Sequence, residues 1–234
     1  MKSLRSVAPL FALGLIGLTI VAFWPSYLGR PFANVDRYTH AHAALGTIWL
    51  LLLLAQTTLI KAGRRGLHLA LGRLSYAAAP LFALSGVLLA NFRFSRMDEA
   101  TFAKEAYTLY LPLSVSLLFL CAYGLALVHR RSIRLHGCFM LCTALVLVDP
   151  VVARTLAFHV VQFPAFWHYQ IVTFSIEFLA LAGLLLSLPS DSAERKTFGG
   201  FSFLFVLVQL LWFVAPRTTA WERFATWFRH LPLT

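Results

Sequence analysis

Charged residues are scarce in this chain, and that scarcity excludes a soluble globular domain. Only 12% of its 234 residues are Asp, Glu, Lys or Arg, whereas 59% are hydrophobic, and the mean hydropathy is +0.75. A soluble domain of this length cannot bury so much apolar surface. The long apolar runs also lack the alternation of β-barrel strands, so their backbone must be hydrogen-bonded within helices. The sequence therefore predicts an all-α integral membrane protein.

Cysteine is scarce as well. Cys121, Cys138 and Cys142 all lie inside apolar runs, where a thiol acts as a small apolar group. This placement argues against a disulfide framework and against a zinc ribbon. The formal net charge of +11 would indicate nucleic acid in a soluble protein, but here Lys and Arg cluster in short segments between the apolar runs. Orientation by the positive-inside rule explains them better, and no nucleic-acid partner is expected.

The apolar runs are long enough to cross a bilayer about seven times. The predicted spans cover residues 7–23, 42–60, 69–90, 107–128, 136–159, 168–188 and 199–215. No small-x-small site follows the first run, which favours a retained helix over a cleaved signal peptide. Residues 1–216 thus form the transmembrane domain, and residues 217–234 form a short interfacial amphipathic helix. Lys and Arg favour a cytoplasmic N-terminus, with Lys2 and Arg5 among the inner charges.

Polar residues inside the predicted spans include Gln56, Asp149, Arg154 and Glu177. Charge is costly in hydrocarbon, so these side chains should face the bundle interior and be partnered or protonated. Asp149 and Glu177 lie at similar depth, and Arg154 is the expected counter-ion. The four form a predicted intramembrane polar relay; the alternative is an ion-pair network that only fixes helix packing. Pro150 predicts a kink beside Asp149.

The histidines fall into two layers at opposite ends of the predicted spans. His68 and His136 begin helices at the inner face, and the outer layer contains His40, His42, His159 and His168. His40 and His42 point to opposite sides of one helix, and His42 shares a stripe with Trp49 and Gln56. We therefore expect His42 to face the bundle. A lone histidine at a membrane edge is otherwise explained as a polar anchor.

One segment carries a resemblance. It reads His68-Leu69-Ala70-Leu71-Gly72-Arg73, it follows a basic turn, and a later histidine, His136, opens another helix. Residues 42–76 and 130–154 together resemble an uncharacterised family of bacterial polytopic membrane proteins, although Leu69 stands where that family often has Arg. The resemblance implies a multi-pass protein of the bacterial inner membrane and no established activity. The layout is also remotely similar to membrane di-haem cytochromes b, which is a fold-level analogy.

Three functions compete on these residues. The first is electron transfer by a b-type haem protein, with His68 and His136 as iron ligands at the inner site and His42 with His159 or His168 at the outer site. Its partner in the bilayer would be quinone or another redox partner. The second is a non-enzymatic transporter, sensor or assembly factor that uses Asp149, Arg154, Glu177 and Gln56 as a relay.

The third is a zinc-dependent membrane hydrolase, with outer histidines and Asp149 as ligands and Glu177 as general base. No two histidines are spaced three or four residues apart, so this hypothesis lacks the usual helical ligand pair. The sequence leaves the cofactor open between haem, zinc and none. It is compatible with an enzyme or a non-enzyme and with any oligomeric state.

Overall fold

Helices joined by short turns make up the architecture. The computed structural model describes the backbone of residues 2–234 and the side chains of residues 8–234, and this range contains no strand. The side chains of Lys2 and Arg5, predicted as inner charges, lie outside the described residues. Seven helical stretches are long and apolar enough to cross a membrane, namely Ala8–Leu28, Arg37–Lys61, Ser75–Ser95, Glu99–Val128, Ile133–Val160, Phe166–Leu186 and Ala193–Arg217. The prediction of an all-α chain with seven candidate spans is thereby confirmed.

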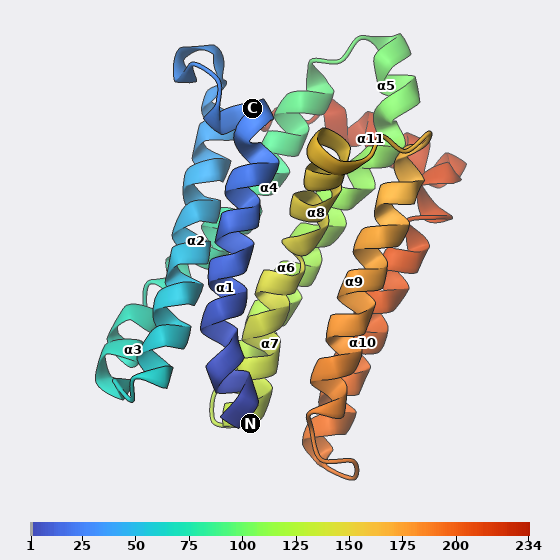
Figure 1. The fold of residues 1–234 in the computed structure, drawn as a ribbon. Coiled ribbons are helices and arrows are strands. Elements are labelled where there is room, and N and C mark those ends of the chain that lie inside the picture. The colour runs from blue at the N-terminus through green and yellow to red at the C-terminus, as the bar shows by residue number, and fades with distance from the viewer. Residues whose placement is uncertain (1) are drawn as a thin grey trace.

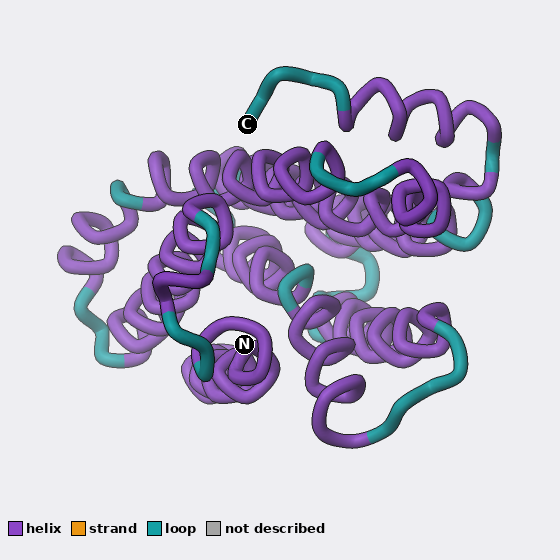
Figure 2. Tube along the Cα trace, turned by 90° about the horizontal axis from the view of Figure 1, so that it is seen from above, coloured by secondary structure: helices purple, strands orange, loops and turns teal. Residues whose placement is uncertain are grey.

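The spans stand side by side as a bundle, with shorter helices at its two ends (Figures 1 and 2). The α-helices are α1 (Lys2–Phe23), α2 (Arg37–Lys61), α3 (Arg65–Gly72), α4 (Ser75–Ser95), α5 (Glu99–Glu105), α6 (Tyr110–Val128), α7 (Ile133–Leu145), α8 (Val148–Thr155), α9 (Phe166–Leu186), α10 (Ala193–Leu211) and α11 (Thr219–Arg229). The end that holds α5 and α11 is drawn uppermost in Figure 1 and is called the upper end here; α3 lies at the lower end.

Two predicted helices are each divided in the structure. The predicted helix 69–90 becomes α3 and α4, with the backbone tightening to three-residue hydrogen bonds at Arg73 and Leu74. The predicted helix 136–159 becomes α7 and α8, which part at Val146 and Leu147. Pro150 explains the second break, because it has no N–H to donate to the carbonyl four residues earlier.

The larger core lies between the packed helices, and a smaller buried cluster joins α4, α5 and α11 at the upper end. α2, α4, α6 and α7 follow one another as packed neighbours, α1 packs on α2 and α8, and α9 pairs with α10. Five of the largest fully buried side chains are aromatic: Trp49, Phe119, Phe139, Phe198 and Phe205. At the upper end α11 packs on α4. This arrangement brings the polar residues of α8, α9 and α10 together.

Candidate functional site

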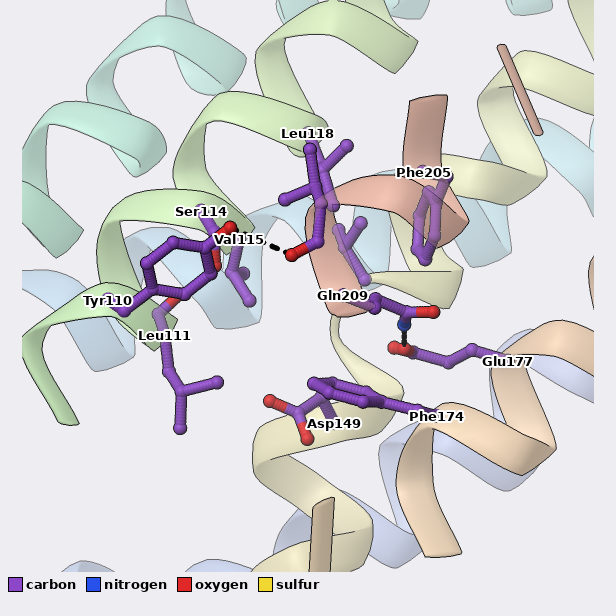
Figure 3. A pocket seen from close by; sticks show the side chains of 12 residues that line it. Tyr110, Leu111, Ser114, Val115, Leu118, Asp149, Phe174, Glu177, Phe205 and Gln209 are labelled. Atoms are coloured by element: carbon purple, nitrogen blue, oxygen red, sulfur yellow. Dashed lines mark hydrogen bonds between the residues drawn. The ribbon is translucent and has the colours of Figure 1, made fainter. Parts of the chain in front are cut away.

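A buried polar cluster joins three helices near their middle. Asp149 lies in the first turn of α8, beside the α7–α8 break, and Thr173 and Glu177 are one turn apart on the inner face of α9. The Thr173 hydroxyl donates a hydrogen bond to Oδ1 of Asp149 at 2.7 Å. The side-chain amide of Gln209, on α10, donates to Oε2 of Glu177. Each carboxylate therefore has a side-chain donor on a neighbouring helix, and Figure 3 shows the bond between Gln209 and Glu177.

Both carboxyl groups are removed from solvent and lack a cation in contact. Asp149 is 4% exposed and Glu177 is 1% exposed. Among the described residues, the ion pairs are Arg134 with Glu194 and Arg229 with Glu99, so neither buried acid belongs to one. The two acids also act on each other electrostatically. In a low-dielectric interior, two neighbouring negative charges without a counter-ion are strongly disfavoured.

A small cavity lies between the two acids. Its volume is about 20 Å³, and its polar lining comes from Tyr110, Ser114, Asp149, Glu177 and Gln209. Figure 3 shows these side chains converging from α6, α8, α9 and α10. Most of the lining is apolar, and the space has room for about one water molecule, which needs two or more polar partners. The chemistry available here is the binding and exchange of a proton.

Arg154 does not form the direct ion pair with Asp149 that we expected. Its guanidinium donates to the carbonyl oxygen of Pro150 at 3.1 Å and lies 4.8 Å from the ring centroid of Phe23 on α1. Five residues along a helix turn the side chain about 140° away from Asp149, which explains the different partner. Arg154 still attracts Asp149 over a longer distance. The acids are thus influenced, but not neutralised, by this arginine.

Gln56 lies apart from the carboxylates, in a second cluster with His68. It is buried on α2, and neither its amide nitrogen nor its oxygen has a hydrogen-bond partner among the described residues. A Cβ added at Gly72 would lie 3.6 Å from that nitrogen. Nδ1 of His68 is likewise buried without a partner. The predicted relay therefore divides into an acidic group and an amide that belongs with the lower histidines.

His68 and His136 are brought within electrostatic range of each other at the lower end. Burial lowers the pKa of the His68 imidazole below its ordinary value of 6.5, and His136 lowers that pKa further. Nδ1 of His136 donates to the carbonyl oxygen of Ala126 at 2.9 Å. A carbonyl can only accept, so this bond fixes the ring and leaves Nε2 with a free lone pair.

The four histidines of the predicted outer layer are each hydrogen-bonded to a different part of the chain. His42 donates from Nδ1 to the Ser85 hydroxyl at 2.9 Å, because that hydroxyl itself donates to a carbonyl of α4. His159 donates to the carbonyl of Val21, and His168 donates to that of Ala165. His40 turns away from the bundle and bonds to the 24–36 loop.

The described residues contain no group of three or more His, Cys, Asp or Glu arranged to hold a metal ion, so the zinc hypothesis gains no ligand set.

Sequence reasoning overlooked Gln209, Tyr110 and Ser114 as members of the acidic cluster. Gln209 had a usable signal, since it is the single amide in a long apolar run. Tyr110 and Ser114 had no such signal, because hydroxyl groups are common along this span.

Comparison with known proteins adds no further assignment: no protein-family model matches the chain, and no curated protein or solved structure shows significant similarity to it. The site must be interpreted from its own chemistry.

Proposed function

We propose that this chain is a proton-binding membrane transporter, in which Asp149 and Glu177 share and exchange a proton. The observation that carries the proposal is the pair of buried carboxyl groups without a contacting cation. Burying both as anions costs several kcal/mol per ion by general experience, whereas a proton held between them removes one charge. Intramembrane acids in this situation typically form proton relays.

Each neighbouring side chain has a defined role in the proposal. The Thr173 hydroxyl and the Gln209 amide each hold one oxygen of a carboxyl group, which fixes the orientation of both acids. The cavity beside them provides room for a water that passes the proton between the acids. Both hydrogen bonds cross helix interfaces, between α8 and α9 and between α9 and α10. Protonation can therefore alter how these helices pack, which is the coupling that a transporter requires.

Infrared difference spectroscopy tests the shared proton directly. We expect the purified protein at neutral pH to show a protonated carboxyl band that shifts in heavy water. Glu177→Gln and Asp149→Asn should each shift or weaken the band, because it then reports only the one remaining buried acid. Glu194→Gln is the matched control, since Glu194 is paired with Arg134 at the lower end. Absence of the band in the unsubstituted protein would refute the proposal.

Proton flux in vesicles tests the functional consequence. The protein is reconstituted into liposomes that contain a pH-sensitive dye, and a membrane potential is imposed. We expect proton entry that Glu177→Gln and Asp149→Asn abolish and that Glu194→Gln leaves unchanged. Flux that persists in both acidic-cluster variants would show that these residues do not carry protons.

A second proposal is a b-type haem held near the lower end by His68 and His136. It is supported by the electrostatic proximity of the two rings and by the free lone pair on Nε2 of His136. The unpartnered Nδ1 of His68 and the glycine at position 72 also suit a bound group. When bound, haem would supply one-electron chemistry, and quinone or another redox partner would exchange the electrons. The outer pairing of His42 with His159 or His168 has no comparable support.

Reduced-minus-oxidised absorption spectra distinguish this second proposal. Protein made in haem-replete cells should show Soret and alpha bands, and His136→Leu should abolish them. His230→Leu is the control, because that histidine lies in the tail and bonds within α11. Haem absent from the purified protein rules out the redox function but leaves the proton proposal intact.

A further inference from the structure

A polar pocket at the upper end has no part in either proposed function. Its volume is about 260 Å³, and it lies between the 24–36 loop, the start of α2 and the end of α4. The polar lining consists of Ser26, Arg30, Asn34, Asp36, Thr39 and Arg93. We propose that this pocket binds a phosphate-type oxyanion, with Arg30 and Arg93 as its cationic ligands.

The arginines supply a positive potential that the protein does not neutralise. Arg30 donates from Nε to the carbonyl of Pro25 at 3.0 Å, which steers its side chain along the loop and leaves its terminal nitrogens available. Arg93 belongs to neither ion pair formed by the described residues. Arg154 lies within electrostatic range of Arg93 and adds to the positive potential. Planar guanidinium groups bind phosphate oxygens through paired, charge-assisted hydrogen bonds.

Asp36 is the single acid in the pocket lining, and the protein already uses both of its oxygens. Oδ1 accepts from the backbone N–H of Thr39 at 2.8 Å, and Oδ2 accepts from the Thr39 hydroxyl at 2.7 Å. Asp36 therefore caps the N-terminus of α2 and does not pair with either arginine. Two arginines against one occupied carboxylate leave the pocket with a net positive charge. Ser26 and Asn34 add neutral hydrogen-bond donors.

The location suits a phosphate carried by a lipid as well as a free phosphate. Trp24 and Phe32, beside the pocket, are each 57% exposed, and aromatic side chains of this kind lie at the headgroup level of membranes. The pocket has room for a phosphate group and part of the molecule attached to it. Both sources share the same oxyanion chemistry, so the experiment must separate them.

Thermal unfolding of the full chain in a phosphate-free maltoside detergent provides the test. The midpoint is measured with inorganic phosphate against chloride of equal ionic strength, with phosphatidylglycerol in mixed micelles, and with diacylglycerol in mixed micelles. We expect at least one phosphate-bearing ligand to raise the midpoint, because a ligand bound only by the folded state stabilises it. Diacylglycerol, which lacks the phosphate, should have no effect. A response to phosphatidylglycerol alone identifies a lipid, and a response to inorganic phosphate identifies a free anion.

Charge-neutralising variants locate the site. Arg93→Gln and Arg30→Gln should each weaken the apparent affinity about ten-fold or more, the cost of losing a charge-assisted contact. The control is Arg96→Gln, which removes the same charge from the end of α4 but whose side chain lies over Phe92 outside the pocket. The proposal is overturned if no phosphate-bearing ligand raises the midpoint, or if Arg96→Gln weakens binding as much as Arg93→Gln. Both pocket variants must elute as folded protein. If one variant does not, the apparent affinity of the other variant tests the proposal.

Discussion

The Thr173 hydroxyl donates a 2.7 Å hydrogen bond to the Asp149 carboxylate and thereby joins α9 to α8 in the middle of the bundle. Thr173 is completely buried, so bulk water cannot replace this donor if it is removed. We expect Thr173→Val, which keeps the shape and loses the hydroxyl, to destabilise the protein by about 1–3 kcal/mol. Thr173→Ser should stay close to the unsubstituted protein. Reversible unfolding in mixed micelles measures both, and equal stability of the two variants would contradict the expectation.

Gln209 and Glu177 should show energetic coupling across α9 and α10. Gln209→Leu leaves the buried Glu177 without its donor, and we expect a loss of about 1–3 kcal/mol. Glu177→Gln removes the acid but keeps an amide that can bond to Gln209, so its cost should be smaller. A double-mutant cycle of Gln209→Leu with Glu177→Leu, each of which removes the bond, measures the coupling energy, which should exceed about 0.5 kcal/mol for residues in contact. Additive effects of the two substitutions would show that the hydrogen bond contributes nothing.

The fold was largely predictable from the sequence, because hydrocarbon restricts the backbone to helices of a known length. The kink at Pro150 followed from proline chemistry, whereas the break after Gly72 had no comparable signal. Within the acidic cluster, burial of Asp149 and Glu177 followed from the cost of charge in hydrocarbon. Their partners did not, because Thr173 and Gln209 become neighbours only through the rotation of three helices. Arg154 was mistaken for a contacting counter-ion for a different reason, because its five-residue spacing from Asp149 on α8 turns it about 140° away.

His68 should make stability depend on pH at the lower end. Its pKa in the folded protein lies below the ordinary value of 6.5, because burial and the nearby His136 disfavour the imidazolium. The unfolded chain therefore binds a proton more readily, and the protein loses stability as the pH falls from about 6.5 toward the folded-state pKa. Above that range His68 is neutral in both states and has no effect on the slope.

His68→Gln removes this titration and isolates it from other groups. We expect the variant to become more stable relative to the unsubstituted protein as the pH is lowered from about 7.5 to about 5.5. This range spans about one pH unit on each side of the ordinary histidine pKa. Unfolding titrations at several pH values provide the measurement. His230→Gln, in the exposed tail, is the matched control for the loss of one histidine. A pH-independent difference for His68→Gln would contradict the burial of its neutral form.

Asn91 should control the docking of α11 at the upper end. It is completely buried, and its amide donates to the carbonyl oxygens of Phe228 at 2.8 Å and Leu231 at 3.3 Å. Both carbonyls also accept backbone bonds, from the N–H groups of Leu231 and Leu233, so Asn91 is a second donor that ties the end of α11 to α4. Asn91→Leu keeps the volume but removes these two bonds between the helices. We expect a loss of about 1–3 kcal/mol and faster proteolysis at the connector before α11.

Arg229 provides the contrast that makes this prediction specific. Its guanidinium also bonds to the carbonyl of Met97 and lies over Phe102, but its acidic partner Glu99 is highly exposed. In Arg229→Met the freed carboxylate of Glu99 is hydrated, and the aliphatic chain still packs on Phe102, so the penalty should be smaller than for Asn91→Leu. Limited proteolysis ranks the two variants, with Asn34→Leu in the exposed loop as the control. Faster cleavage of Arg229→Met than of Asn91→Leu would show that the ion pair, and not the buried amide, fastens α11 to the bundle.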